Sequence, residues 1–98
     1  MDYNQAKKLM KLQEQAKDIQ NELSTKCFSI KSSNVKVIIN GQLKLIAVEF
    51  DDTYFIQHPD DIKKQIVSAV NEGMEQAQTY AKFRMSEVMS QFEVKHVL

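Results

Sequence analysis

The sequence has few of the residues that define many small protein classes. Its 98 residues include one cysteine, two glycines, one proline and no tryptophan. The single cysteine, Cys27, excludes an internal disulfide and a cysteine-type zinc site. No apolar run approaches the roughly 20 residues of a membrane-spanning helix. The N-terminus has no apolar signal core, so a cytoplasmic location is expected.

The chain also lacks a net charge, because basic and acidic residues are equal in number. Their distribution is uneven: residues 1–48 contain eight lysines and four acidic residues, whereas residues 49–98 contain five basic and nine acidic residues. The first half can therefore form a basic patch. An ordinary solvated polar surface explains the same counts equally well.

The first 23 residues carry a helical pattern. Apolar residues recur there at alternating spacings of three and four: Leu9, Leu12, Ala16, Ile19 and Leu23. This seam is typical of a coiled-coil helix, and Asp2 followed by Gln5 resembles a capping box. We therefore predict a helix from about Asp2 to Leu23.

The middle of the chain has the pattern of a β-sheet. A weak strand is predicted over 25–31, and the β-branched run 35–39 predicts a strong one. Asn40-Gly41 then favours a tight hairpin turn with positive φ at these positions, returning as a strand over 42–50. With an even-length loop, Ile46 shares a face with Val37 and Ile39. The opposite face is also largely apolar, so both faces are expected to need cover.

The second half of the chain predicts a short connection and then one long helix. Residues 51–57 are expected to be a connection, and Pro59 with Asp60 and Asp61 favours a helix start. Apolar residues continue at helical spacing to near Phe92, with Gly73 as the weak position. Such a helix spans about 50 Å, whereas a compact chain of this size is about 32 Å across.

This excess length predicts a homodimer, because the far end of the long helix still carries apolar residues that one protomer cannot cover. The expected interface combines residues of both helices and the hairpin: Leu9, Leu12, Ile19, Leu43, Leu45, Met85, Val88 and Phe92.

Candidate chemistry is weak for catalysis and stronger for phosphate binding. Cys27 has no histidine nearby in sequence, so no enzyme activity is expected and no cofactor or metal is implied. Basic residues on the two helices could neutralise phosphates, or could simply keep the helices soluble. These candidate DNA-binding residues are Lys7, Lys8, Lys11, Lys17, Lys82 and Arg84.

Three strings, in this order, carry a family resemblance. They are AKKLMKLQEQA over 6–16, VKVIING over 35–41 running on to VEFD over 48–51, and IVSAVNEG over 66–73. Together they resemble the YbaB/EbfC family of bacterial nucleoid-associated proteins, and the hairpin string is the most specific. The family usually has glycines before the second strand, where this chain has SIKSSN over 29–34.

The resemblance implies an α+β fold over a single domain, residues 1–98: an N-terminal helix, a three-stranded antiparallel sheet and a long C-terminal helix, paired into a tongs-shaped homodimer. It implies binding of duplex DNA with little sequence preference and a place in the nucleoid, without membrane or small-molecule partners. Two alternatives remain at this point. One is a protein-interaction adaptor that uses paired helices, and the other is a metal-dependent enzyme with its site near Asp51 and Asp61.

Overall fold

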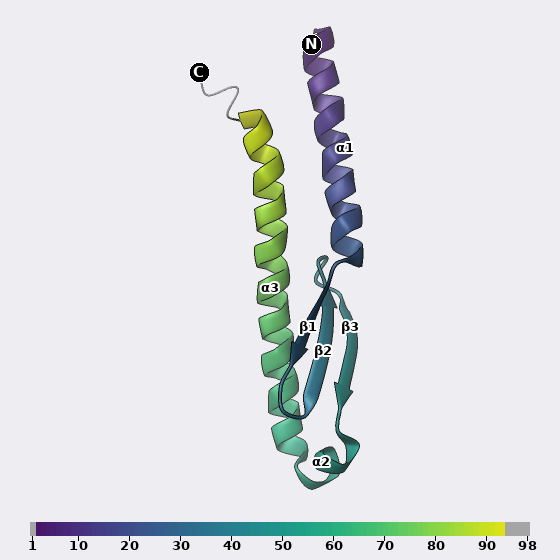
Figure 1. Cartoon of the computed structure of the whole chain (residues 1–98), viewed down its shortest axis with the longest axis vertical. Coiled ribbons are helices and arrows are strands. Elements are labelled where there is room, and N and C mark those ends of the chain that lie inside the picture. Colours follow the sequence, from purple (N-terminus) through teal and green to yellow (C-terminus); the bar gives the residue numbers. More distant parts are fainter. Residues whose placement is uncertain (1, 94–98) are drawn as a thin grey trace.

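The computed structural model describes residues 2–93, and side chains as far as residue 90. The elements are α1 (Tyr3–Thr25), β1 (Cys27–Lys31), β2 (Val35–Asn40), β3 (Leu45–Phe50), α2 (Asp52–Gln57) and α3 (Pro59–Glu93). The molecule is elongated, with extents of 67 × 23 × 15 Å. In Figure 1, α1 and α3 run antiparallel and extend as two arms beyond one end of the sheet. The predicted order of helix, three antiparallel strands and long helix is confirmed.

The start of α1 follows the predicted cap. The Asp2 carboxylate accepts a hydrogen bond from the backbone N–H of Gln5 at 2.8 Å. This bond satisfies one of the N–H groups that have no partner within the helix. The second long helix, α3, begins at Pro59 with Asp60 and Asp61 in its first turn, as predicted.

The core lies between α3 and one face of the sheet, in which β2 is the central strand. Its buried residues come from the sheet and from α3: Ile30, Val35, Val37, Ile39, Ile62, Ala69 and Ala77. Gly73 of α3 lies against this face, and a Cβ atom there would come within 2.8 Å of Ile39 Cδ1. Gly73 is therefore more than a weak position in the helix, because it allows α3 to approach the sheet closely.

The β2–β3 turn differs from the prediction. Positive φ occurs at Leu43 (64°) and not at Gly41, and residues 40–44 separate the paired residues Ile39 and Leu45, so the loop is odd in length. An irregularity then leaves Ile46 without a partner between the pairs Ile39–Leu45 and Ile38–Ala47. Ile46 is 54% exposed rather than sharing the buried face of Val37 and Ile39. Beyond the bulge, Val48 pairs with Val37.

Residues expected to be only a connection form the short helix α2. Asp51 caps it, because its carboxylate accepts a hydrogen bond from the Tyr54 backbone N–H at 2.9 Å. Phe50, the last residue of β3, is 38% exposed, and its ring lies beside Phe55 of α2 with centroids 5.1 Å apart. A helix of six residues is too short to show a clear apolar period in the sequence, which explains why the pattern did not predict it.

Candidate nucleic-acid interface

The N-terminal half of α1 carries a cluster of lysines on the free part of the arm. Lys7, Lys8 and Lys11 are all exposed, and with Asn4 they line one shallow hollow. The Lys7 ammonium lies 6.0 Å from the ring centroid of Tyr3. Helical geometry places Lys17 about 120° around the helix from Lys11. The structure therefore groups three of the predicted lysines and separates the fourth from them.

Lys82 lies at the junction of the two arms and the sheet. It shares a groove with Lys44 of the β2–β3 turn, which the sequence pattern did not single out. The rest of the groove combines glutamines with apolar residues: Gln20, Leu23, Gly41, Gln42, Leu43, Gln78 and Ala81. A second positive charge is thus placed near Lys82 by a residue 38 positions earlier in the chain, which no local spacing could reveal.

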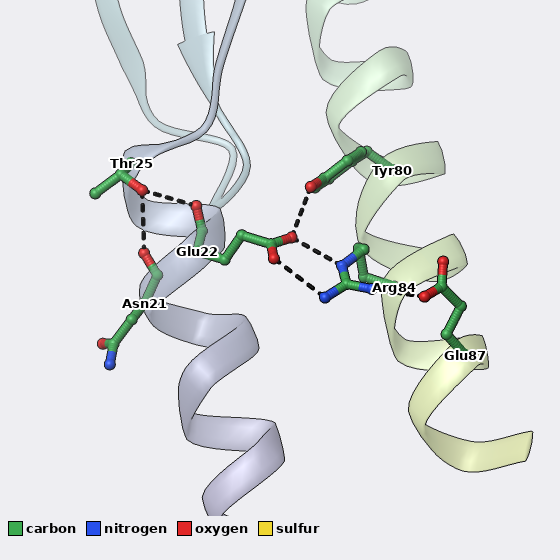
Figure 2. Close-up of polar contacts among 6 residues, drawn as sticks. All are labelled: Asn21, Glu22, Thr25, Tyr80, Arg84 and Glu87. Carbon is green, nitrogen blue, oxygen red and sulfur yellow. Dashed lines mark hydrogen bonds and ion pairs between the residues drawn. The ribbon is translucent and has the colours of Figure 1, made fainter. Parts of the chain in front are cut away.

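Arg84 is held in a network of carboxylates between the arms (Figure 2). Its Nε donates to Glu22 Oε2 at 2.9 Å and its Nη2 donates to Glu22 Oε1 at 3.1 Å. Its Nη1 donates to Glu87 Oε2 at 2.6 Å. The forked pairing of guanidinium and carboxylate is a strong and directional contact. Arg84 is therefore engaged within the chain, unlike the lysines of α1.

Tyr80 completes this network and connects it to the sheet. Its hydroxyl donates to Glu22 Oε2 at 2.6 Å, and its ring packs edge-on against Phe28 of β1, with centroids 5.6 Å apart. The hydrogen bond from Arg84, and next that from Tyr80, hold the pKa of Glu22 below its ordinary value. The same contact with Glu22 raises the pKa of the Tyr80 hydroxyl. The carboxylate is therefore stabilised in its charged form.

The two arms pack on each other through a small apolar cluster of their own. Ile19, Leu23 and Val88 are buried there, and Leu12 and Ala81 are partly buried against them. Ile19 and Val88 were predicted to contact a second protomer, but α1 and α3 of one chain already bury them to 3% and 8% exposure. Antiparallel packing within the protomer supplies that cover.

Four more of the predicted interface residues lie at the surface of the single chain. Leu9, Leu43, Leu45 and Met85 are between 36% and 49% exposed. The side chain of Phe92 lies outside the described residues.

The β2–β3 turn caps the end of α1. The Gly41 backbone N–H donates to the carbonyls of Leu23 and Lys26, both at 2.9 Å. The buried Asn40 side chain donates to Ser24 O at 3.3 Å and accepts from the backbone N–H groups of Gln42 and Lys44. The last carbonyls of a helix have no partner within it. Asn40-Gly41 therefore fixes how the arm leaves the sheet, a role that the hairpin signal did not predict.

The acidic residues near α2 are used for local structure. Asp51 caps α2, and the Asp61 carboxylate accepts hydrogen bonds from the Tyr54 hydroxyl and from Gln65. Within the part of the chain that the structure describes, no three His, Cys, Asp or Glu side chains gather as a metal site would require. The helices among residues 2–93 also include none long and apolar enough to cross a membrane.

Two antiparallel helical arms on a small three-stranded sheet, with a lysine cluster on one arm, define a class of small α+β proteins. The model of the YbaB/EbfC DNA-binding family matches residues 2–92, and the chain belongs to this family.

Individual relatives agree with this assignment. The chain is 35% identical over 75 residues to the nucleoid-associated protein Cj1642 of Campylobacter jejuni, covering 74% of this chain and 75% of that protein. It is 35% identical over 63 residues to a nucleoid-associated protein of Nitratiruptor sp., covering 62% of this chain and 60% of the relative. The crystal structure of the uncharacterized protein HP0035 from Helicobacter pylori has the same fold, with a TM-score of 0.79 at 20% identity, over 91% of this chain and 98% of that one.

Proposed function

We propose that this protein binds duplex DNA as a homodimer, with little sequence preference, and helps to organise the nucleoid. The observation that carries the proposal is the grouping of Lys7, Lys8 and Lys11 on one exposed face of a projecting helix, in a chain of a family named for DNA binding. The names of the two bacterial relatives support the nucleoid role.

The mechanism that these residues support is neutralisation of phosphates. A lysine ammonium is a compact point charge on a flexible stem, so it attracts phosphate oxygens without reading base edges. The N-terminal part of α1, which carries the three lysines, extends beyond the sheet (Figure 1), where a long duplex can reach it. Lys17 and Lys82 are exposed and could add contacts at the sides of the arms. Arg84 is left out of this proposed surface because its charge is paired with Glu22 and Glu87.

Unpartnered apolar residues support the homodimer. Leu43, Leu45 and Ile46 on the hairpin are 40%, 49% and 54% exposed. Val67 and Met74 continue, at seven-residue spacing, the stripe of α3 that includes Ala81, yet they are 61% and 36% exposed. Large exposed apolar patches commonly mark protein interfaces. A second copy that covers these residues would also double the number of lysine-bearing arms.

The experiment that tests DNA binding removes the lysine cluster. The triple variant Lys7→Gln, Lys8→Gln, Lys11→Gln should bind duplexes of unrelated sequence more weakly than wild type. The loss of affinity should be about the same for each duplex. The slope of log affinity against log salt should become less steep by about 0.9 for each phosphate that the variant no longer neutralises. Gel-shift or fluorescence-anisotropy titrations at several salt concentrations measure both quantities.

A matched control removes the same charge at the other end of the molecule. Lys31 is the last residue of β1, and Lys63 and Lys64 lie in the first turns of α3. All three are exposed, and these segments lie at the end of the molecule away from the arms. Their triple change to glutamine should leave the salt slope nearly unchanged. A wild-type slope near zero, or equal losses of affinity in both triple variants, would refute the proposed lysine surface.

One observation favours a second function, that of an adaptor for another protein. Glu72, Glu75 and the 61%-exposed Phe83 line a groove along the outer side of α3. This combination suits a basic peptide with an apolar anchor. The adaptor hypothesis gains support if no duplex is retarded at low salt and if a protein partner, recovered after nuclease treatment, no longer binds the Phe83→Ser variant.

A further inference from the structure

We propose that Arg84 is a positioning residue: through Glu22 it sets the direction of the lysine-bearing arm of α1 and does not itself contact DNA phosphate. This inference rests on the proposed function, because the arm is the proposed DNA-binding element. It concerns a residue whose charge and place on the long helix suggested direct phosphate contact.

Three of the five N–H donors of Arg84 are already used within the chain. All three guanidinium nitrogens donate within the chain, two of them to the two oxygens of Glu22 and the third to Glu87. The Arg84 and Glu22 side chains are only 29% and 35% exposed. A phosphate bound to the two remaining N–H groups would lie beside the negative charges of Glu22 and Glu87. Like charges at such short range repel each other, so direct contact between phosphate and Arg84 is unfavourable.

The network lies near the attached end of α1, far from the lysines. Glu22 lies in the last turns of the helix, just before the residues that the β2–β3 turn holds. Lys7 is 15 residues further out, which corresponds to about 22 Å of helix. A tilt of about 10° at Glu22 would therefore move Lys7 by about 4 Å over that length. This displacement exceeds the tolerance of a hydrogen bond, so the network controls where the lysines are presented.

Tyr80 connects the same carboxylate to the sheet. Its hydroxyl donates to Glu22, while its ring packs on Phe28 and lies 5.4 Å from the Lys26 ammonium. Glu22 is thus held from α3 by two side chains one helical turn apart. Two fixed donors on one carboxylate restrict the rotation of α1 as well as its distance from α3.

Glu22→Gln separates the two roles of Arg84. If Arg84 contacts phosphate, Glu22→Gln frees the guanidinium, removes a repelling carboxylate and strengthens DNA binding. If Arg84 positions the arm, Glu22→Gln and Arg84→Gln each weaken binding, by about two- to fivefold at fixed salt, as expected for removing a partly exposed ion pair. Glu14→Gln is the matched control, because it removes an exposed carboxylate of the same helix that has no ion pair among the described residues.

The charge swap Glu22→Arg with Arg84→Glu gives a second, independent readout. Positioning predicts that the swap recovers most of the affinity and keeps the wild-type salt slope. Direct contact predicts a lasting fall in affinity and a slope less steep by about 0.9 for the one phosphate that Arg84 would neutralise. Circular dichroism on each variant shows that the helices are retained. Tighter binding by Glu22→Gln, or no recovery in the swap, would overturn the inference.

Arm geometry can be measured without DNA. Spin labels at Gln13→Cys and Ser90→Cys, in a Cys27→Ser background and diluted with unlabelled protein, report the α1–α3 distance within one protomer. Glu22→Gln and Arg84→Gln should broaden and lengthen this distance, and the charge swap should restore it. If wild type binds no DNA, the proposed function fails, and the distances alone decide whether Arg84 positions the arm. Unchanged distances in both single variants would refute the positioning role.

Discussion

The close contact between Gly41 and the end of α1 makes Gly41→Ala the most direct test of how the arm is attached. A Cβ atom at this position would lie 2.8 Å from Leu23 O and 2.9 Å from Leu23 Cα. Both are backbone atoms, so no side-chain rotation relieves the clash. A backbone shift of Gly41 away from α1 is also opposed, because its N–H donates to the carbonyls of Leu23 and Lys26. Its φ is not positive, so the cost comes from packing alone.

The expected magnitude follows from the size of this overlap. Forcing one extra methyl group into a tightly packed site typically costs about 1–3 kcal/mol. For a chain of this length, about 2 kcal/mol corresponds to a fall in melting temperature of about 8–16 °C. Thermal unfolding followed by circular dichroism measures this change. All samples need the same protein concentration, because a homodimer melts at a concentration-dependent temperature.

Gly73→Ala is the matched control for this prediction. Its Cβ would also meet an atom at 2.8 Å, but that atom is Ile39 Cδ1, the end of a flexible side chain. Alanine in place of glycine within a helix gains about 1 kcal/mol, which offsets part of the crowding. Gly73→Ala should therefore shift the melting temperature much less. If Gly41→Ala melts at the wild-type temperature, or no lower than Gly73→Ala, the proposed close contact between Gly41 and the end of α1 is refuted.

Two further predictions concern self-association and pH. Ile46→Lys places a charge in the exposed apolar hairpin, so light scattering after size exclusion should show a halved mass, and an unchanged mass would contradict the proposed dimer surface. The folded-state pKa of Glu22 is lowered, so its contribution to stability is present above the ordinary value of 4.5 and is lost as the pH falls through the folded value. The melting-temperature gap between wild type and Glu22→Gln should therefore close in acid, and a gap that stays constant to about pH 2 would count against the ion pair.

The candidate surface was only partly predictable from sequence. The grouping of Lys7, Lys8 and Lys11 follows from helical spacing alone, since they lie within four residues of each other on a predicted helix. The role of Arg84 does not, because its main partner is 62 residues away. Charge is visible in a sequence, but whether a charge is free or paired depends on which helix packs beside it.

The Asn40-Gly41 pair shows the same division. Its composition indicated a turn, and a turn is present. Its use as a cap for the carbonyls of α1 required the helix end and the hairpin to meet in space. The short helix α2 was missed for another reason, since a single capped segment leaves no apolar period to detect.

The sequence by itself determined the order of the two long helices and the three strands, the length of the two helices and the face that Val37 and Ile39 share. These features depend on local periodicity, capping residues and β-branched runs, which act over a few neighbouring residues. The tertiary structure alone decided that α1 runs antiparallel to α3, that Ile19 and Val88 bury each other within one chain, and that Glu22 holds Arg84. Those outcomes depend on contacts between residues far apart in the chain, whose geometry is fixed only when the arms and the sheet pack together.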